Sequence, residues 1–156
     1  MIRHATPRSG SDEALADALH SASIHLLRGL RKADVLSGVS PARLSALSVV
    51  VFAGPLRISD LARAEQVKTP TITPIVAALE SDGLVVREKD ENDGRAAVLR
   101  ATARGEKLMA EGRARRVARL TAALRELSPS ERRTLRAAAA LMHQLAKKNS
   151  MRGLAP

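Results

Sequence analysis

The chain of 156 residues contains no cysteine and almost no aromatic residues. Without cysteine there can be no disulfide, thiolate metal ligand, cysteine nucleophile or cysteine-based redox switch. Phe52 is its one aromatic residue, so the sequence offers no platform on which single-stranded nucleic acid could stack. No apolar run approaches the roughly 20 residues that span a bilayer. Acidic residues precede the first apolar stretch, which argues against a secretory signal. We therefore expect a cytoplasmic protein without a membrane partner.

Positive charge is in excess, with 26 Lys and Arg residues against 16 Asp and Glu and a formal net charge of +10. Such an excess suggests a polyanionic partner such as nucleic acid, although a solvated basic surface is the simpler alternative. Residues 57–104 hold eight basic and eight acidic residues, whereas residues 105–156 hold twelve and four. The net charge is therefore consistent with DNA binding but does not by itself indicate which segment binds.

Helical periodicity begins after a short N-terminal segment. Residues 1–10 show no periodicity and are predicted to be a mobile tail. Within residues 11–36, apolar residues recur at spacings of three and four, which predicts an amphipathic helix; they are Leu15, Leu19, Ala22, Leu26 and Leu30. A Ser-Pro pair at 40–41 supplies the N-cap and first-turn proline of a second helix, and the Gly-Pro pair at 54–55 ends it.

Two short helices and a β-hairpin follow. Ser59 is the expected N-cap of the first short helix, with Val67 facing inward. The second has its apolar face within residues 72–79 and ends at Gly83, in a left-handed conformation. A β-hairpin is predicted over residues 84–99, because an Asp-Gly pair separates two β-prone runs.

Two long helices complete the predicted fold. The first starts at Thr102 and runs to about Leu127. Ser128 and Glu131 have the spacing of a capping box and open the last helix. Residues 149–156 are expected to form a C-terminal tail. The predicted fold class is therefore mainly α with one small β-hairpin.

No pattern for catalysis or metal binding is present. His20 and His25 are five residues apart, which is not a metal-ligand spacing on a helix, and no acidic residue lies between them. The sequence contains no Gly-x-Ser-x-Gly elbow and no glycine-rich loop that could hold phosphate. We predict that the protein is not an enzyme and has no metal or cofactor.

Residues 57–105 have the layout of a winged helix-turn-helix, in which the second short helix enters the major groove and the hairpin lies alongside the duplex. Lys68, Thr69, Thr71 and Thr73 lie off the apolar face of that helix. These residue types suit phosphate and base-edge contacts near a helix N-terminus. The alternative is that the threonines only cap the helix.

Three stretches of this region resemble the multiple-antibiotic-resistance regulator (MarR) family. They are Ile58-Ser59-Asp60-Leu61-Ala62, Thr69-Pro70-Thr71-Ile72-Thr73 and Leu79-Glu80-Ser81-Asp82-Gly83-Leu84-Val85. Asp93-Gly94-Arg95 matches the family's Asp-x-Arg wing signature, and Thr102-Ala103-Arg104-Gly105 matches its Thr-x-x-Gly helix start. The combination and its spacing are specific, and the resemblance covers roughly residues 11–148.

The resemblance implies a homodimer that binds a pseudo-palindromic operator in double-stranded DNA and represses transcription. It assigns residues 40–101 to the winged helix-turn-helix and residues 11–36 and 102–148 to a helical dimerisation region. Family members are often released from DNA by a small, commonly phenolic, ligand. Those that sense peroxides use a reactive cysteine, so a signal here would be a non-covalent small molecule.

The resemblance also assigns roles to individual residues. Arg95 would enter the minor groove, where arginine reads groove width more than a base code, and Asp93 would hold the wing. A ligand pocket would involve His20, His25 and Phe52. The complete set of predicted DNA contacts is Lys68, Thr69, Thr71, Thr73, Arg87, Lys89 and Arg95.

Pro74 departs from the family, which usually has a polar or basic residue at this position. Proline cannot donate a hydrogen bond there, and inside a helix it costs up to about 3 kcal/mol. We therefore predict that the helix starts near Thr71 or is locally distorted, and that the wing and backbone contacts carry more of the affinity. Ala101, where leucine is usual, is only a smaller core residue.

Two other functions are consistent with the sequence. A non-specific or architectural DNA-binding protein would bind random and operator DNA with similar affinity. A helical interaction protein that has lost DNA binding would retard no duplex near physiological salt.

Overall fold

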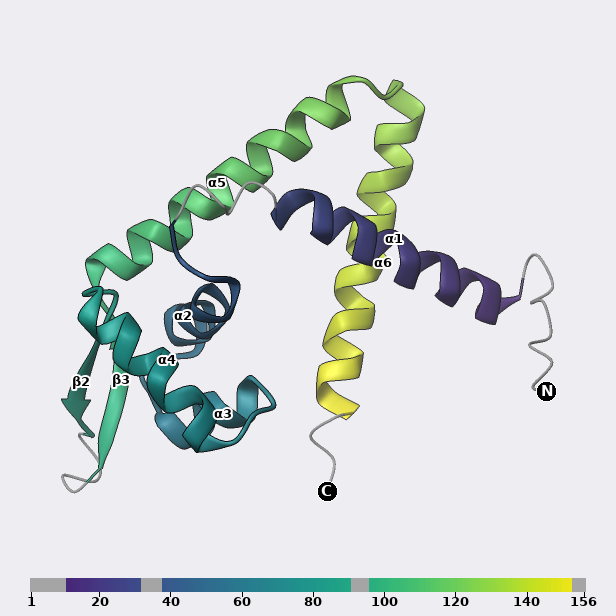
Figure 1. The fold of residues 1–156 in the computed structure, drawn as a ribbon. Helices are drawn as coiled ribbons and strands as arrows, with labels where there is room; N and C mark the ends of the chain where they lie inside the picture. The colour runs from purple at the N-terminus through teal and green to yellow at the C-terminus, as the bar shows by residue number, and fades with distance from the viewer. Residues whose placement is uncertain (1–10, 32–37, 91–95, 153–156) are drawn as a thin grey trace, which may run out of the picture. The chain divides into compact units, whose positions relative to one another are not determined.

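The computed structural model describes residues 11–31, 38–90 and 96–152, without the side chains of 149–152 (Figure 1). Its helices and strands are α1 Asp12–Arg31, α2 Pro41–Ala53, β1 Leu56–Arg57, α3 Ile58–Ala64, α4 Thr69–Ser81, β2 Val85–Lys89, β3 Ala97–Ala101, α5 Ala103–Arg125 and α6 Pro129–Arg152. The predicted fold class, mainly α with a small β wing, is confirmed. The chain divides into two compact units, Met1–Arg116 and Val117–Pro156. Across the described ranges, no helix is both long and apolar enough to cross a membrane.

The core of the first unit lies where α2, α3 and α4 pack on one another and on the sheet. Its buried side chains are Ala46, Leu47, Val50, Leu61, Ala62, Ile72, Val76, Leu79, Leu84, Val85, Leu99 and Met109. Burial of each leucine contributes about 1.5–3 kcal/mol to stability. This packing holds α4 by one face and leaves the opposite face in solvent.

The three strands form an antiparallel sheet in the order β1-β3-β2. The predicted hairpin is confirmed, with Val85 opposite Ala101 and Lys89 opposite Ala97. Strand β1 was not predicted. It is only two residues long, too short for an alternating pattern, and it forms because Leu56 pairs with Leu99 of β3.

The start of α2 confirms the predicted cap, whereas the start of α3 does not. The hydroxyl of Ser40 accepts a hydrogen bond from the Arg43 amide at 3.4 Å. Helix α3 follows β1 directly, with Arg57 in the N-cap position and no side-chain cap, so Ser59 lies within its first turn. Val67 follows the end of α3 and is 38% exposed, so the prediction that it faces inward is wrong.

Helix α4 starts at Thr69, so the predicted start near Thr71 is wrong. Lys68 has an extended backbone and its carbonyl accepts the first helical hydrogen bonds. Pro70 lies in the first turn, where proline is favoured, and Pro74 lies inside the helix. The earlier start arises because Pro70 suits the first turn as well as Pro74 would in a shorter helix. A local distortion at Pro74 stays a prediction.

A compact junction connects the hairpin to α5. Gly83 has φ +68°, which confirms the predicted left-handed end of α4. The Thr102 hydroxyl donates to the Gly83 carbonyl at 2.7 Å and accepts from the Gly105 amide at 3.1 Å. A Cβ on Gly105 would collide with the Leu84 carbonyl oxygen. The Thr-x-x-Gly pattern therefore allows the start of α5 to pack closely on the hairpin.

The second unit confirms the predicted capping box. The Glu131 carboxylate accepts from the Ser128 amide at 2.8 Å, and the Ser128 hydroxyl accepts from the Glu131 amide at 3.3 Å. Hydrogen bonds from the Ser128 side chain and backbone lower the pKa of Glu131 below its ordinary value. Helix α5 ends at Arg125, slightly before Leu127, and α6 continues to Arg152, into the segment predicted as a tail.

Candidate nucleic-acid interface

The α4 residues predicted to contact DNA lie on its exposed side. Lys68, in the N-cap position, and Thr69, Thr71 and Thr73 are all exposed. The opposite side of the helix, formed by Ile72, Val76 and Leu79, is buried in the core. The core thus fixes which side of α4 is presented to a partner.

Hydrogen-bond donors on the exposed side of α4 are concentrated at its start. The Thr73 hydroxyl donates to the Thr69 carbonyl at 2.8 Å, so its proton is already engaged. Pro74 has no N–H. Donation to a partner from this part of α4 therefore falls to the Lys68 ammonium and to the hydroxyls of Thr69 and Thr71.

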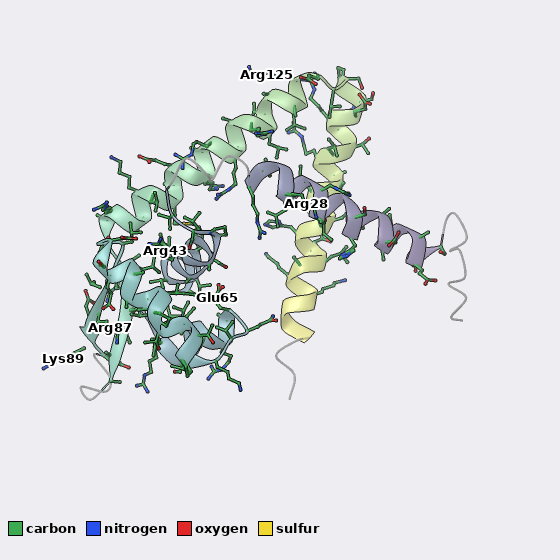
Figure 2. All side chains as sticks on the ribbon, in the orientation of Figure 1. Arg28, Arg43, Glu65, Arg87, Lys89 and Arg125 are labelled. Atoms are coloured by element: carbon green, nitrogen blue, oxygen red, sulfur yellow. The ribbon has the colours of Figure 1, made fainter. Side chains whose placement is uncertain are left out.

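Strand β2 contributes two basic residues, Arg87 and Lys89, which differ in whether they form an ion pair (Figure 2). The Nε of Arg87 contacts both carboxylate oxygens of Glu80, on α4, at 3.0 and 3.1 Å. Lys89 is exposed and forms no ion pair with another described residue. In Figure 2 it extends away from the wing. Lys89 is thus available to a phosphate at once, whereas Arg87 must first exchange its partner.

Other arginines on this sheet are also paired with carboxylates. Arg57 contacts Asp90 at 2.9 Å, and Arg100 contacts Glu88 at 2.6 Å. The Arg100–Glu88 pair is exposed, and such pairs contribute only about 0–1 kcal/mol, so a phosphate can replace that carboxylate at small cost. Asp90 is only 14% exposed, so its pair with Arg57 is held more firmly. Asp93 and Arg95 lie outside the described residues, and their predicted roles in the wing stay predictions.

One supporting contact was not predicted from the sequence. Arg43 on α2 forms an ion pair with Asp82, at the C-terminal end of α4, at 2.7 Å. The two residues are far apart along the chain, so no local pattern joins them. This pair connects the end of α4 to α2.

A cavity of about 830 Å³ lies in the first unit beside α2 and α5. Its lining residues are Leu27, Arg31, Gly38, Val39, Ser40, Pro41, Arg43, Leu44, Ser45, Ser48, Leu108, Met109, Gly112, Arg115 and Arg116. His20 and His25 are exposed on α1, and Phe52 is 77% exposed on α2; none of them lines this cavity. Within the described ranges, no group of three or more His, Cys, Asp or Glu residues could hold a metal ion.

The cavity is basic as well as apolar. Among the described residues, the charged ones that line it are all arginines. Two of these arginines have carboxylate partners outside the lining, Arg43 with Asp82 at 2.7 Å and Arg115 with Glu111 at 4.0 Å. The Nε of Arg115 is buried and has no hydrogen-bond partner among the described residues. A buried donor without an acceptor is unfavourable, so an anionic group beside Arg115 would be stabilised there.

A core of short helices that presents one exposed helix, followed by a β-hairpin with basic residues, defines a winged helix-turn-helix DNA-binding protein. The sequence model of the MarR family matches residues 39–97, from just before α2 to the start of β3. The uncharacterised HTH-type transcriptional regulator Mb0904 of Mycobacterium bovis is 36% identical over 132 residues, which cover 85% of this chain and 92% of that relative. The chain therefore belongs to the MarR family of DNA-binding transcriptional regulators.

Solved structures show the same fold. The transcriptional regulator Tm0710 of Thermotoga maritima has a TM-score of 0.77 at 24% identity, covering 90% of this chain and 99% of that one. A MepR mutant of S. aureus bound to an oligodeoxyribonucleotide has a TM-score of 0.63 at 18% identity, covering 85% and 97%. CouR of Rhodococcus jostii RHA1 bound to p-coumaroyl-CoA has a TM-score of 0.57 at 24% identity, covering 85% and 93%.

Proposed function

We propose that this regulator is a homodimeric repressor that binds a pseudo-palindromic operator and is released by a small non-covalent ligand. The observation that carries the proposal is that one packed unit presents the exposed side of α4 together with a basic strand of the wing. We call residues 57–104, which contain α4 and the wing, the reader. A dimer with two-fold symmetry would place two readers on the two half-sites of the duplex. We also propose a cytoplasmic location, as expected from the sequence, since duplex DNA is found in that compartment of a bacterial cell.

In the proposed complex, α4 enters the major groove. Lys68, Thr69 and Thr71 reach phosphates and base edges from its start, and Lys89 contacts the backbone from the wing. Arg95 enters the minor groove, as the family resemblance implies, and Asp93 supports the wing. The oligonucleotide bound to MepR supports DNA as the partner of this fold.

The charge of the reader favours specific over non-specific binding. Non-specific affinity comes from cations that neutralise phosphates and release counterions. The eight basic residues between 57 and 104 are balanced by eight acidic ones, so the reader has little general attraction for DNA. Useful affinity then requires base and groove contacts, which depend on sequence.

Exposed apolar side chains support the homodimer. Leu15 and Leu26 on α1 are 59% and 52% exposed, and Leu141 and Leu145 on α6 are 59% and 51% exposed. Large apolar side chains that stay half exposed on a helix are typical of an interaction site, and burying the exposed part of each leucine against a second copy would contribute roughly 1 kcal/mol. Both helices belong to the region predicted for dimerisation, residues 11–36 and 102–148.

The arginine-lined cavity is the proposed ligand site. Its volume falls in the range of small-molecule sites, about 300–1,000 Å³. An acidic molecule with an apolar body would place its anion at Arg115 and its body against Leu44 and Met109. The p-coumaroyl-CoA bound to CouR supports an acidic ligand in this family. His20, His25 and Phe52, which the resemblance suggested, stand outside this cavity.

The central experiment compares the affinity of the purified protein for its upstream DNA and for a random duplex at fixed salt. A specific regulator should prefer the upstream site by roughly 10³ or more. Arg95→Ala should lower the affinity and the salt slope. Equal affinity for both duplexes would instead support an architectural protein, and no binding to either would support a helical interaction protein.

Release by a ligand is tested with the same complex and a panel of aromatic acids. We expect Arg115→Met to abolish release without changing operator affinity in the absence of ligand. Arg113→Met is the matched control, because Arg113 is an exposed residue of α5 that does not line the cavity. Release that is unaffected by Arg115→Met would refute this cavity as the ligand site.

A further inference from the structure

The ion pair between Arg87 and Glu80 connects the two parts of the reader. Glu80 lies near the end of α4, and Arg87 lies on β2 of the wing (Figure 2). The Arg87 Nε contacts both carboxylate oxygens at 3.0 and 3.1 Å, and the side chains are 43% and 28% exposed. Arg87 is thus held by the helix that faces DNA, although its own strand belongs to the wing.

The pair has a direct consequence for DNA affinity. A cation that neutralises a phosphate releases condensed counterions, and this release drives sequence-independent binding. The pair of Arg87 and Glu80 is neutral as a whole, so Arg87 in this pair contributes little to such binding. A half-exposed pair is weak, however, and a phosphate can take the place of the carboxylate when it is held close enough.

We propose that Glu80 is a specificity-determining residue, which withholds Arg87 from the phosphates of non-operator DNA and releases it in the operator complex. The inference rests on the proposed function, in which α4 enters the major groove of an operator. Base contacts between α4 and the operator hold the wing close to the sugar-phosphate backbone of the DNA. At this short distance a phosphate replaces the Glu80 carboxylate as the partner of Arg87. On other sequences no such contacts hold the wing, and Arg87 stays with Glu80.

The test is the salt dependence of binding of the full-length protein to a random duplex and to its upstream DNA. Glu80→Gln should steepen the slope of log K against log[salt] on the random duplex by about 1.8, from two additional phosphate contacts per dimer at 0.9 each. Between 50 and 200 mM salt the variant should therefore lose about twelvefold more affinity for the random duplex than the wild type. The slope on the upstream DNA should change little, since Arg87 already contacts a phosphate there.

Arg87→Met provides an independent arm that does not depend on the folding of the Glu80 variant. We expect it to reduce the slope by about 1.8 on the upstream DNA and to leave the slope on the random duplex unchanged. A reduced slope on both duplexes would mean that Arg87 contacts phosphates everywhere, and the inference would be wrong. Glu80→Gln should have no effect on the slope in the Arg87→Met background.

Glu65→Gln is the matched control for charge. It removes one negative charge from the same unit, but the Glu65 carboxylate accepts from the Ser45 hydroxyl at 3.0 Å and does not contact Arg87 (Figure 2). Its slopes should match the wild type. If Glu65→Gln steepened the salt slope as much as Glu80→Gln, the effect would come from loss of general repulsion between a carboxylate and the DNA phosphates. That result would refute the inference. If the wild type itself fails to distinguish the two duplexes, the proposed function fails instead.

Discussion

Pro74 lies inside α4, and its replacement by alanine is expected to make the protein more stable. Proline in a helix interior costs about 3 kcal/mol relative to alanine, because it lacks an N–H and its ring meets the carbonyl four residues earlier, here that of Pro70. Pro74 is exposed, so its removal sacrifices no core packing.

Two effects reduce the gain below the full value. Only the first turn of α4 precedes Pro74, so its ring can be accommodated by a small adjustment of that one turn rather than of a longer helix. Proline also lowers the conformational entropy of the unfolded chain, which stabilises the folded state by about 0.4–1 kcal/mol. The alanine variant loses this stabilisation. We therefore expect Pro74→Ala to raise the free energy of unfolding by about 1–2 kcal/mol. For a chain of this size that corresponds to roughly 2–8 °C in Tm.

The assay is thermal and urea unfolding of the full-length protein at one fixed concentration, because dimerisation makes Tm depend on concentration. Pro70→Ala is the matched control: Pro70 occupies the first turn of the same helix, where proline is favoured, so this change should give no gain. A Pro74→Ala variant no more stable than the wild type would refute the reasoning. Equal gains in both variants would show that position within the helix does not matter.

Gly105→Ala should destabilise the protein by about 1–3 kcal/mol in urea unfolding, because the new Cβ would collide with the Leu84 carbonyl oxygen. Gly29→Ala, in α1 with nothing within 4 Å of its Cβ, should be neutral or stabilising, and similar losses in both would contradict the collision. Ser128→Ala should cost about 1 kcal/mol and raise the pKa of Glu131 toward its ordinary value in an NMR titration. Because folding lowers this pKa, the contribution of Glu131 to stability is present above its ordinary pKa of 4.5 and is lost as the pH falls through the lowered value. The stability difference between the wild type and Glu131→Gln should accordingly shrink on acidification.

The sequence determined those features of this protein that depend on neighbouring residues. Ser40 caps α2, Gly83 ends α4 in a left-handed conformation, and Ser128 with Glu131 forms a capping box, all as the local pattern predicted. The side of α4 that carries Thr69 and its neighbours was also predictable, since helical periodicity separates buried from exposed positions. These features require only a few consecutive residues, and their physical chemistry is local.

Contacts between distant segments were decided only by the tertiary structure. The Thr69 start of α4 was mispredicted because the cost of Pro74 was weighed alone, whereas Pro70 also suits the first turn and the buried face of the helix packs on the core. Strand β1 exists because β3 lies beside it, and neither the Arg43–Asp82 pair nor the Glu80–Arg87 pair follows from any local spacing. The MarR pattern in the sequence thus identifies the family, and the fold determines which charged side chains of α4 and the β2–β3 hairpin are already held in ion pairs.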